Sequence, residues 1–382
     1  MKVYFYCLPP KAGRRPAYQF QLVYLAEGLQ SLGVPIFANI DYWKIESDQY
    51  LFRHDPTVGP HDCDVAVISS IWRDYGGEFP PEIFAADRRF LTVCIDTFDG
   101  LFTSTFEPAS RGFDVILKQT IRGLDYPGNV VSSWTFGLGQ FVIDFLAEPK
   151  PWAERVPAMM VNFRNLHPLR ELAERRFLDR LPRPWQVDPV IETRDYAYRP
   201  EALGAKQTYF DLAHVQSGQR HHPEYLRRLQ AGWGVAAFGG YILPHRWWLA
   251  SPARERWSRY VYRHSANGRL VEALRRWNLT INDTRAVYQW DSWRLWEGWA
   301  AGAVVFHVDF DLYGIEMPVM PQNWVHYVGI DLRKPEQSLG RLQAMTADDL
   351  RRIALEGRQW ALAHYSPLAV ANRFVALLSR YL

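Results

Sequence analysis

The chain has 382 residues, of which 48% are hydrophobic and 22% are charged. This length exceeds one ordinary domain and predicts two domains of about 150 to 200 residues, each with its own core. The formal net charge is only +3, from 44 basic and 41 acidic residues, which excludes the strong general attraction for nucleic acid that a basic protein has, so no nucleic-acid partner is expected.

Residues 1–147 are predicted to form a Rossmann-like domain. An apolar run at residues 3–8 is followed by a loop, and residues 20–29 then carry apolar side chains at helical spacing. The next apolar run, residues 36–40, completes a strand–loop–helix–strand unit, which is typical of a parallel sheet. Three further runs predict buried strands of the same sheet, at residues 65–68, 90–95 and 114–117.

Residues 148–157 are rich in proline and charge and predict a linker to a second Rossmann-like domain over residues 158–365. The regular elements expected early in that domain are a strand at 158–163, a helix at 169–181, a helix at 225–230 and a strand at 235–238. Residues 182–206 are expected to be irregular, and residues 241–285 to form an insertion rich in Trp, Arg and Tyr.

Two final helices are predicted at residues 347–364 and 368–381. Thr346 and Asp349 have the spacing of a capping box, which marks the start of the first of them. Elsewhere in the second domain, the pair His221-His222 is expected in an ordinary loop, because adjacent side chains do not easily face one ligand.

Residues 289–307 join a polar helix start to an apolar strand. Asp291 or Ser292 can cap a helix that ends at Gly302, and a strand follows at residues 303–306. A helix that leads directly into a buried strand is how a Rossmann-like domain presents a nucleotide diphosphate.

Arg294 and Glu297 lie one turn apart near the start of that helix. A helix N-terminus offers unpaired N–H groups and the positive end of its dipole, and Arg294 adds a guanidinium fork, which together suit a diphosphate. Glu297 could then accept hydrogen bonds from ribose hydroxyls. The alternative is a core helix with a polar cap, because packing alone can explain Trp290, Trp293, Trp296 and Trp299.

The pattern Ser292-x-Arg294-x-x-Glu297-Gly-x-Ala-Ala-Gly302 resembles the donor-site helix of GT-B glycosyltransferases, in particular the exostosin-like and CgeB-like group. Residues 324–331 and 349–358 are similar to the strand and helix that follow in those proteins. The resemblance rests on the C-terminal part of the chain. It implies an α/β fold of two Rossmann-like domains whose parallel sheets face each other across a cleft, with residues 366–382 as a helix that crosses back to the first domain.

The activity that the resemblance implies is glycosyl transfer, of hexosyl or related groups. The second domain would bind a nucleotide-diphosphate sugar, and the sugar would pass to a hydroxyl of a carbohydrate, lipid-linked or protein acceptor on the first domain. Retaining members often carry a glutamate eight residues before the one matched by Glu297, and Gln289 stands there, so a retaining outcome is not supported. The alternatives are a nucleotide-sugar epimerase and a catalytically silent nucleotide-sugar-binding or assembly protein of a glycan pathway, which Gln289 keeps open.

The resemblance implies three donor-binding residues in the helix: Ser292, Arg294 and Glu297. Arg164 is a further candidate for the diphosphate, because it follows the first strand of the second domain and would face the cleft. Gly239 and Gly240 follow another strand, where the backbone can approach a ligand closely. An ordinary exposed arginine and a simple turn are the alternatives at these positions.

Two residues are candidates for the chemistry of transfer. Arg294 would stabilise the negative charge of the leaving diphosphate. Asp96 is the candidate base, because it ends the strand predicted at 90–95 and would point from the carboxyl edge of the first sheet into the cleft. Capping of the next segment is the ordinary alternative for Asp96.

Two D-x-D patterns, Asp62-Cys-Asp64 and Asp309-Phe-Asp311, match the motif by which a different glycosyltransferase fold holds a metal-bound diphosphate. Neither follows the N-terminal sheet as that fold requires, so we expect solvated loops and no metal at either place. We also expect no cofactor other than the nucleotide-sugar co-substrate.

The three cysteines, Cys7, Cys63 and Cys94, are far apart in apolar contexts. This spacing excludes a disulfide framework and a cysteine-based zinc site, and it predicts a reducing, cytoplasmic setting. The N-terminal apolar run is too short for a signal peptide, and no run of about 18 apolar residues occurs. Membrane association, if present, is expected to be peripheral, at the inner face of the membrane.

Overall fold

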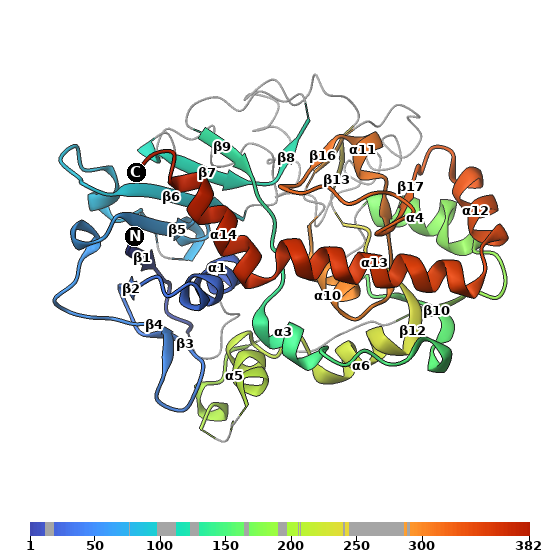
Figure 1. Cartoon of the computed structure of the whole chain (residues 1–382), viewed down its shortest axis with the longest axis horizontal. Helices are drawn as coiled ribbons and strands as arrows, with labels where there is room; N and C mark the ends of the chain where they lie inside the picture. The colour runs from blue at the N-terminus through green and yellow to red at the C-terminus, as the bar shows by residue number, and fades with distance from the viewer. Residues whose placement is uncertain are drawn as a thin grey trace, which may run out of the picture.

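The structure is a computed structural model that describes residues 1–11, 19–75, 77–97, 112–122, 130–163, 168–189, 197–204, 206, 208–239, 241–243, 286–288 and 291–382. Two parallel sheets, each flanked by helices, form its framework (Figure 1). One continuous cluster of buried apolar side chains runs through both halves, from Val3 to Leu378.

The N-terminal sheet has six parallel strands in the order β2-β1-β5-β6-β7-β9. They are β1 (Val3–Tyr6), β2 (Ile36–Ala38), β5 (Val65–Ser69), β6 (Leu91–Asp96), β7 (Val115–Lys118) and β9 (Val130–Ser133). The five strands predicted here are confirmed, and β9 is an addition. Every residue of β5 is buried, as expected for a parallel sheet covered on both faces. The strand order reverses between β1 and β5.

Smaller elements surround this sheet. Its helices are α1 (Phe20–Ser31), α2 (Trp72–Tyr75) and α3 (Gln140–Phe145). The predicted helix at residues 20–29 is confirmed as α1, of which ten residues are buried, so it packs on nearly all sides. An antiparallel pair, β3 (Tyr42–Lys44) and β4 (Tyr50–Phe52), lies beside α1.

The C-terminal sheet has five parallel strands in the order β11-β10-β12-β15-β17. They are β10 (Val156–Val161), β11 (Gln186–Pro189), β12 (Gly232–Ala236), β15 (Val304–Val308) and β17 (Val328–Ile330). The strand β11 lies within residues 182–206, where irregular structure was expected, so that prediction was wrong there. As an exposed edge strand it needs no apolar run, and its sequence Gln-Val-Asp-Pro does not stand out as a strand. The order reverses between β10 and β12.

Eight helices of this half are described. They are α4 (Pro168–Arg176), α5 (Tyr209–Gln216), α6 (Pro223–Ala231), α10 (Trp293–Ala300), α11 (Phe310–Tyr313), α12 (Pro335–Ala344), α13 (Ala347–Tyr365) and α14 (Pro367–Leu378). The capping box at the start of α13 is confirmed, since the Asp349 N–H donates to Thr346 Oγ1 at 3.2 Å and the Thr346 N–H donates to Asp349 Oδ2 at 3.1 Å. Among the described helices, none is long and apolar enough to cross a membrane.

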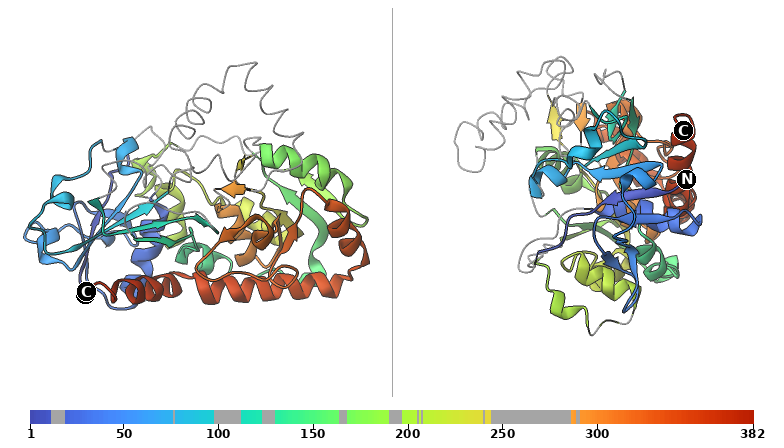
Figure 2. Two further views of the ribbon diagram at one scale, coloured as in Figure 1. Left: turned by 90° about the horizontal axis from the view of Figure 1, so that it is seen from above. Right: turned by 90° about the vertical axis from the view of Figure 1, so that its left-hand side faces the viewer.

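The last two helices connect the halves. The long helix α13 lies along the C-terminal half, the chain turns at Ser366, and α14 continues against α1 of the N-terminal half (Figure 1). Seen from above, α13 and α14 run along one side of both halves (Figure 2). Gly28 of α1 makes this contact possible, because a Cβ there would lie 1.9 Å from the Pro367 carbonyl oxygen.

We expect Gly28→Ala to lower the melting temperature, because the added methyl group overlaps backbone and not a movable side-chain tip. The expected loss in the free energy of unfolding is about 1–3 kcal/mol. Gly340→Ala in α12 is the matched control, since nothing lies within 4 Å of a Cβ there. This control should be neutral or more stable by up to about 1 kcal/mol. Equal melting temperatures for the two variants would contradict the close α1–α14 contact.

The two halves also share a short antiparallel ladder. The strand β8 (Thr120–Ile121) of the N-terminal half pairs with β16 (Ile315–Glu316) of the C-terminal half. Thr120 Oγ1 donates to Glu316 Oε2 at 2.9 Å, and the Arg122 N–H donates to the Gly314 carbonyl at 2.7 Å. A second pair, β13 (Tyr241–Leu243) with β14 (Ala286–Tyr288), joins the two ends of the predicted insertion. The rest of that insertion, residues 244–285, lies outside the described residues.

Candidate functional site

The helix α10 begins at the carboxyl edge of the C-terminal sheet. The predicted helix that ends at Gly302 and leads into a strand is confirmed as α10 and β15. Ser292 occupies the N-cap position, but its side chain makes no capping bond, and within the described part of the chain its buried Oγ has no hydrogen-bond partner. Gly298 lets the helix lie close to the sheet, since a Cβ there would be 2.5 Å from Val235 Cγ1. The start of α10 is therefore held close to the sheet, and the Ser292 side chain does not cap it.

Asp291 anchors the start of α10 to the segment that follows the N-terminal sheet. Its buried carboxylate accepts hydrogen bonds from the Phe136 N–H and from Trp296 Nε1. Burial raises the pKa of Asp291 to about 7 and outweighs the lowering effect of these donors. Asp291 therefore serves as a structural anchor between the two halves and not as a solvent-facing cap.

Two arginines meet beside the end of β10. The Arg294 guanidinium lies 6.0 Å from the ring centroid of Phe163, and the Arg170 guanidinium, from α4, lies 5.4 Å from the same ring. Arg170 Nε also donates to the Phe238 carbonyl at 3.0 Å, just after β12. Since the strand order reverses between β10 and β12, these two cations lie at the position where open parallel sheets bind ligands.

Asn162 directly precedes Phe163 in the sequence. It follows β10 directly, is 2% exposed, and its Oδ1 has no hydrogen-bond partner among the described residues. A buried amide without a partner is costly, so such groups usually have a ligand or an ordered water. Neither Asn162 nor Arg170 was singled out in the sequence, because a lone Asn or Arg after a strand is a common loop residue.

Of the other residues predicted for this region, the structure describes Gly239. The Gly239 N–H points at the buried His307 Nε2, at 3.3 Å, so this amide is directed into the sheet. Arg164, Gly240 and Gln289 lie outside the described residues, and their predicted roles stay predictions.

Glu297 is 5% exposed and does not stand open at the helix surface. His221 Nδ1 lies 2.5 Å from Glu297 Oε1. The loop predicted at His221-His222 is confirmed, since the pair lies between α5 and α6. Its two side chains have structural contacts that were not predicted: the His221 side chain is 1% exposed, and His222 caps α6 by accepting the Glu224 N–H at 3.2 Å. Local sequence carries no signal for the contact between His221 and Glu297, which are 76 positions apart.

Asp96 lies at the carboxyl end of β6, in the N-terminal sheet. Its side chain is completely buried and forms an ion pair with Lys118 Nζ at 2.5 Å, at the end of the neighbouring strand β7. Sequence reasoning missed Lys118, which becomes a neighbour of Asp96 only through the register of the sheet.

The aspartates of both D-x-D patterns form hydrogen bonds or ion pairs with other groups of the protein. Asp309 caps α11 by accepting the Leu312 N–H at 3.1 Å, and Asp311 pairs with the exposed Arg122 at 3.2 Å. In the first pattern, Asp62 accepts the Gly59 N–H at 2.8 Å and Asp64 accepts the Lys2 N–H at 2.6 Å. Across the described ranges, no three His, Cys, Asp or Glu side chains gather as metal ligands would.

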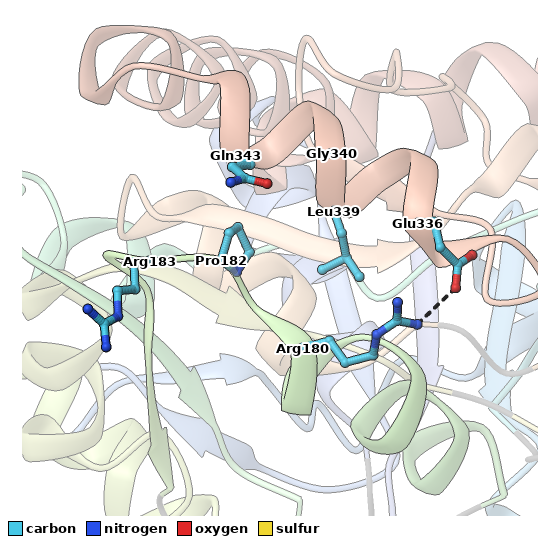
Figure 3. Close-up of a pocket in the computed structure, with 7 residues that line it drawn as sticks. All are labelled: Arg180, Pro182, Arg183, Glu336, Leu339, Gly340 and Gln343. Carbon is cyan, nitrogen blue, oxygen red and sulfur yellow. Dashed lines mark hydrogen bonds and ion pairs between the residues drawn. The ribbon is translucent and has the colours of Figure 1, made fainter.

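A groove on the C-terminal half lies away from all these residues. It is lined mainly by α12 and by the end of a short 3₁₀ helix, η5 (Leu178–Arg180), where Arg180 pairs with Glu336 at 2.9 Å (Figure 3). Pro182 and Arg183 of its lining precede β11, so the groove lies beside the amino end of that strand, opposite the edge that carries Arg294. An exposed ion pair of this kind contributes little to stability or binding.

Glu27 forms a second buried carboxylate at the junction of the halves. It accepts hydrogen bonds from the Tyr209 hydroxyl and from the Gln140 N–H, the latter at 2.8 Å. Burial raises the pKa of Glu27 to about 7, although both hydrogen bonds lower it.

Because burial raises the pKa of Glu27 and Asp291, we expect the free energy of unfolding to fall as the pH rises. The folded protein binds a proton at Glu27 that the unfolded chain has already released, so this stabilising contribution is lost as the pH rises through about 7. The free energy of unfolding, and with it the melting temperature, should fall between about pH 4.5 and pH 7 and then level off. The free energy should fall by up to about 1.4 kcal/mol per pH unit for each such group. Glu27→Gln should reduce the slope, whereas the exposed control Glu356→Gln should leave it unchanged. Identical slopes in both variants would contradict the role of Glu27.

Comparisons with known proteins concern the fold. No protein-family model matches the chain, and no curated protein matches it in sequence. Among solved structures, an alpha-glucosyltransferase (AGT) in complex with UDP has a TM-score of 0.51 at 9% identity, over 99% of this chain and 100% of that one. An alpha-glucosyltransferase in complex with UDP-glucose and DNA containing an abasic site has a TM-score of 0.51 at 9% identity, over 99% and 98% of the two chains.

A third structure, AviGT4, a glycosyltransferase involved in avilamycin A biosynthesis, has a TM-score of 0.48 at 14% identity, over 100% of this chain and 97% of that one. The alpha-glucosyltransferase alignments span nearly the whole of both chains, and both sheets are parallel. The predicted GT-B fold, with two Rossmann-like domains, is therefore confirmed.

Proposed function

We propose that the protein is a glycosyltransferase that moves a sugar from a nucleotide-diphosphate sugar to an acceptor hydroxyl. The donor binds at the carboxyl edge of the C-terminal sheet, beside Arg294, and the acceptor binds on the N-terminal domain. The GT-B fold supports this division, because the carboxyl edges of two parallel sheets supply two ligand sites. The matched alpha-glucosyltransferase structures hold UDP or UDP-glucose, which makes UDP-glucose the first donor to test.

One observation carries the proposal. Two guanidinium groups, of Arg170 and Arg294, lie near the Phe163 ring at the point where the strand order reverses, and Arg294 stands at a helix start that Ser292 does not cap. The residue before Phe163 is Asn162, whose buried Oδ1 has no hydrogen-bond partner among the described residues. A diphosphate leaving group needs positive charge and N–H donors, and this position provides both. Guanidinium forks are also well suited to bidentate phosphate contacts.

Asp96 is proposed as the group that takes the proton of the acceptor hydroxyl. Its place at the carboxyl edge of the first sheet supports this role, and the ion pair with Lys118 Nζ holds the carboxylate in position there. The same pair favours a second candidate function, because Lys118 occupies the carboxylate and its burial limits access. That candidate is a nucleotide-sugar-binding protein without catalysis.

Thermal denaturation with a panel of UDP-, GDP-, ADP- and CMP-sugars tests donor binding. A ligand at about 100 times its dissociation constant should stabilise the protein by about 2.7 kcal/mol. One nucleotide should raise the melting temperature of the wild type and raise that of Arg294→Ala much less. No shift with any nucleotide would contradict the proposal, and a shift without turnover would favour the binding protein.

Metal dependence is the next test. If Arg294 and backbone N–H groups stabilise the leaving diphosphate, transfer should persist in EDTA. Asp309→Asn and Asp311→Asn should change the rate by less than about tenfold. Loss of activity in EDTA that Mn²⁺ or Mg²⁺ restores, together with loss in both variants, would place a metal at these aspartates and contradict this account.

A further inference from the structure

The loop between α5 and α6 has an unusual backbone. Within four residues, Gly218, Gln219 and His221 have φ angles of 67°, 62° and 51°. Glycine adopts this left-handed conformation freely, but Gln219 and His221 carry a Cβ and are strained there. Such strain persists only where neighbouring contacts hold the backbone, and it is concentrated at functional sites.

Buried hydrogen bonds hold this loop in place. The Arg220 carbonyl accepts from His214 Nδ1 at 2.9 Å and from Ser217 Oγ at 3.2 Å. The Gln219 N–H donates to the His214 carbonyl at 2.7 Å. Ser217 is completely buried, and Arg220 is 6% exposed. The direction in which the chain leaves Arg220 is therefore fixed, and with it the position of the next side chain, His221.

The loop places the His221 ring among three aromatic rings. Its centroid lies 5.3 Å from Phe20, 5.3 Å from Phe141 and 4.9 Å from Trp293, the first residue of α10. In this position Nδ1 lies 2.5 Å from Glu297 Oε1, within hydrogen-bond distance. The second oxygen of Glu297, Oε2, has no hydrogen bond to any residue in the described ranges.

We propose that His221 is a positioning residue, which holds one oxygen of Glu297 so that the other is directed at the ribose hydroxyls of the bound nucleotide. This inference rests on the proposed function. A free glutamate side chain would lose rotamer freedom on binding, whereas one already held by His221 loses little. The benefit is the same in the ground state and the transition state, so it acts on nucleotide affinity and not on turnover.

Three substitutions of His221 distinguish the effect of its side chain from the effect of its left-handed backbone conformation. Glycine removes the ring and accepts the left-handed backbone. Asparagine also tolerates that backbone, and its amide nitrogen is as far from Cβ as Nδ1 is, so it keeps the donor. Aspartate has the shape of asparagine but no donor, and it faces Glu297 with a second negative charge. His221→Asn and His221→Asp are thus a matched pair if the glycine variant is too unstable to study.

The experiment measures dissociation constants by calorimetry for UDP, GDP, ADP and CDP with the wild type, and then for the tightest of these with the variants. Steady-state kinetics with the matching nucleotide sugar gives kcat and KM. We expect His221→Gly and His221→Asp to weaken binding by about tenfold with kcat nearly unchanged. His221→Asn should restore most of the affinity. In a Glu297→Gln background, His221→Gly should have less than about a twofold effect, because the contact it serves is already lost.

Two different failures are distinguishable. If the wild type binds a nucleotide but the His221 and Glu297 effects are independent, or His221→Asn is as weak as His221→Asp, the positioning role is overturned and the proposed function stands. If the wild type binds none of the four nucleotides, the proposed function fails and the positioning role fails with it.

Discussion

Arg294→Ala is expected to reduce donor turnover by about 100- to 1000-fold, the loss seen when one donor to a developing anion is removed. Arg294 lies at the start of α10 and shares the Phe163 ring with Arg170, so it is the charged group placed best for the leaving diphosphate. The fold should survive, because Arg294 is only half-buried and Asp291 holds the start of the helix separately. Nucleotide release from the donor, followed with time, measures the effect.

The matched control for this variant is Arg351→Ala. Arg351 is an exposed arginine of α13 whose pair with Asp348 is 3.4 Å long, and its loss should leave turnover unchanged. Arg294→Lys should keep part of the activity, because an ammonium supplies charge without the planar fork. Normal turnover by Arg294→Ala at an unchanged melting temperature would contradict the placement of the donor diphosphate beside Arg294.

Glu297→Gln is expected to raise KM for the donor by about 10- to 100-fold while kcat changes little. The amide still accepts from His221 through its oxygen, so the loop and the helix stay joined, but it places an NH₂ group where the ribose hydroxyls need an acceptor. Glu297→Ala should have the same kinetic effect and should also lower the melting temperature, since it leaves His221 Nδ1 without its acceptor in the core.

Steady-state kinetics over a range of donor concentrations separates the two parameters for the Glu297 variants. A collapse of kcat at unchanged KM would mean that Glu297 acts on the sugar or the reaction centre and not on the ribose. Gln216→Glu serves as a control for a conservative amide–carboxyl exchange elsewhere in the interdomain region, since Gln216 bonds the Lys44 backbone at 2.6 Å and 2.9 Å. It should alter stability without a selective effect on donor KM.

Local sequence was sufficient to predict the helix that carries the candidate site. The signals for this helix all lie within a dozen residues: polar residues at its start, apolar residues at helical spacing, and Gly302 after its end. Gly302 has a φ of 64°, the left-handed conformation that often ends a helix. The buried strands were predicted for the same reason, since each is a short apolar run. The edge strand β11 was missed, because an exposed edge imposes no apolar pattern on its residues.

The partners of the site residues could not be predicted from the sequence. Lys118 meets Asp96 through the register of two neighbouring strands, and His221 meets Glu297 through a strained loop that tertiary contacts hold. Asp291 or Ser292 was expected to cap the helix; Ser292 occupies the N-cap position, and the packing of the two halves makes Asp291 a buried anchor. In each case the deciding contact joins residues distant in sequence, and nothing in the local pattern specifies it.

The central claim is that this chain cleaves the bond between a sugar and a nucleotide diphosphate. Phosphorus NMR of the wild type with the nucleotide sugar that raises its melting temperature most tests this directly. The account predicts that the sugar-linked diphosphate signals decline and those of the free nucleoside diphosphate rise, with water as acceptor when no other is present, and that Arg294→Ala abolishes this change. Diphosphate signals that persist unchanged, or that convert to those of an isomeric nucleotide sugar, would contradict it.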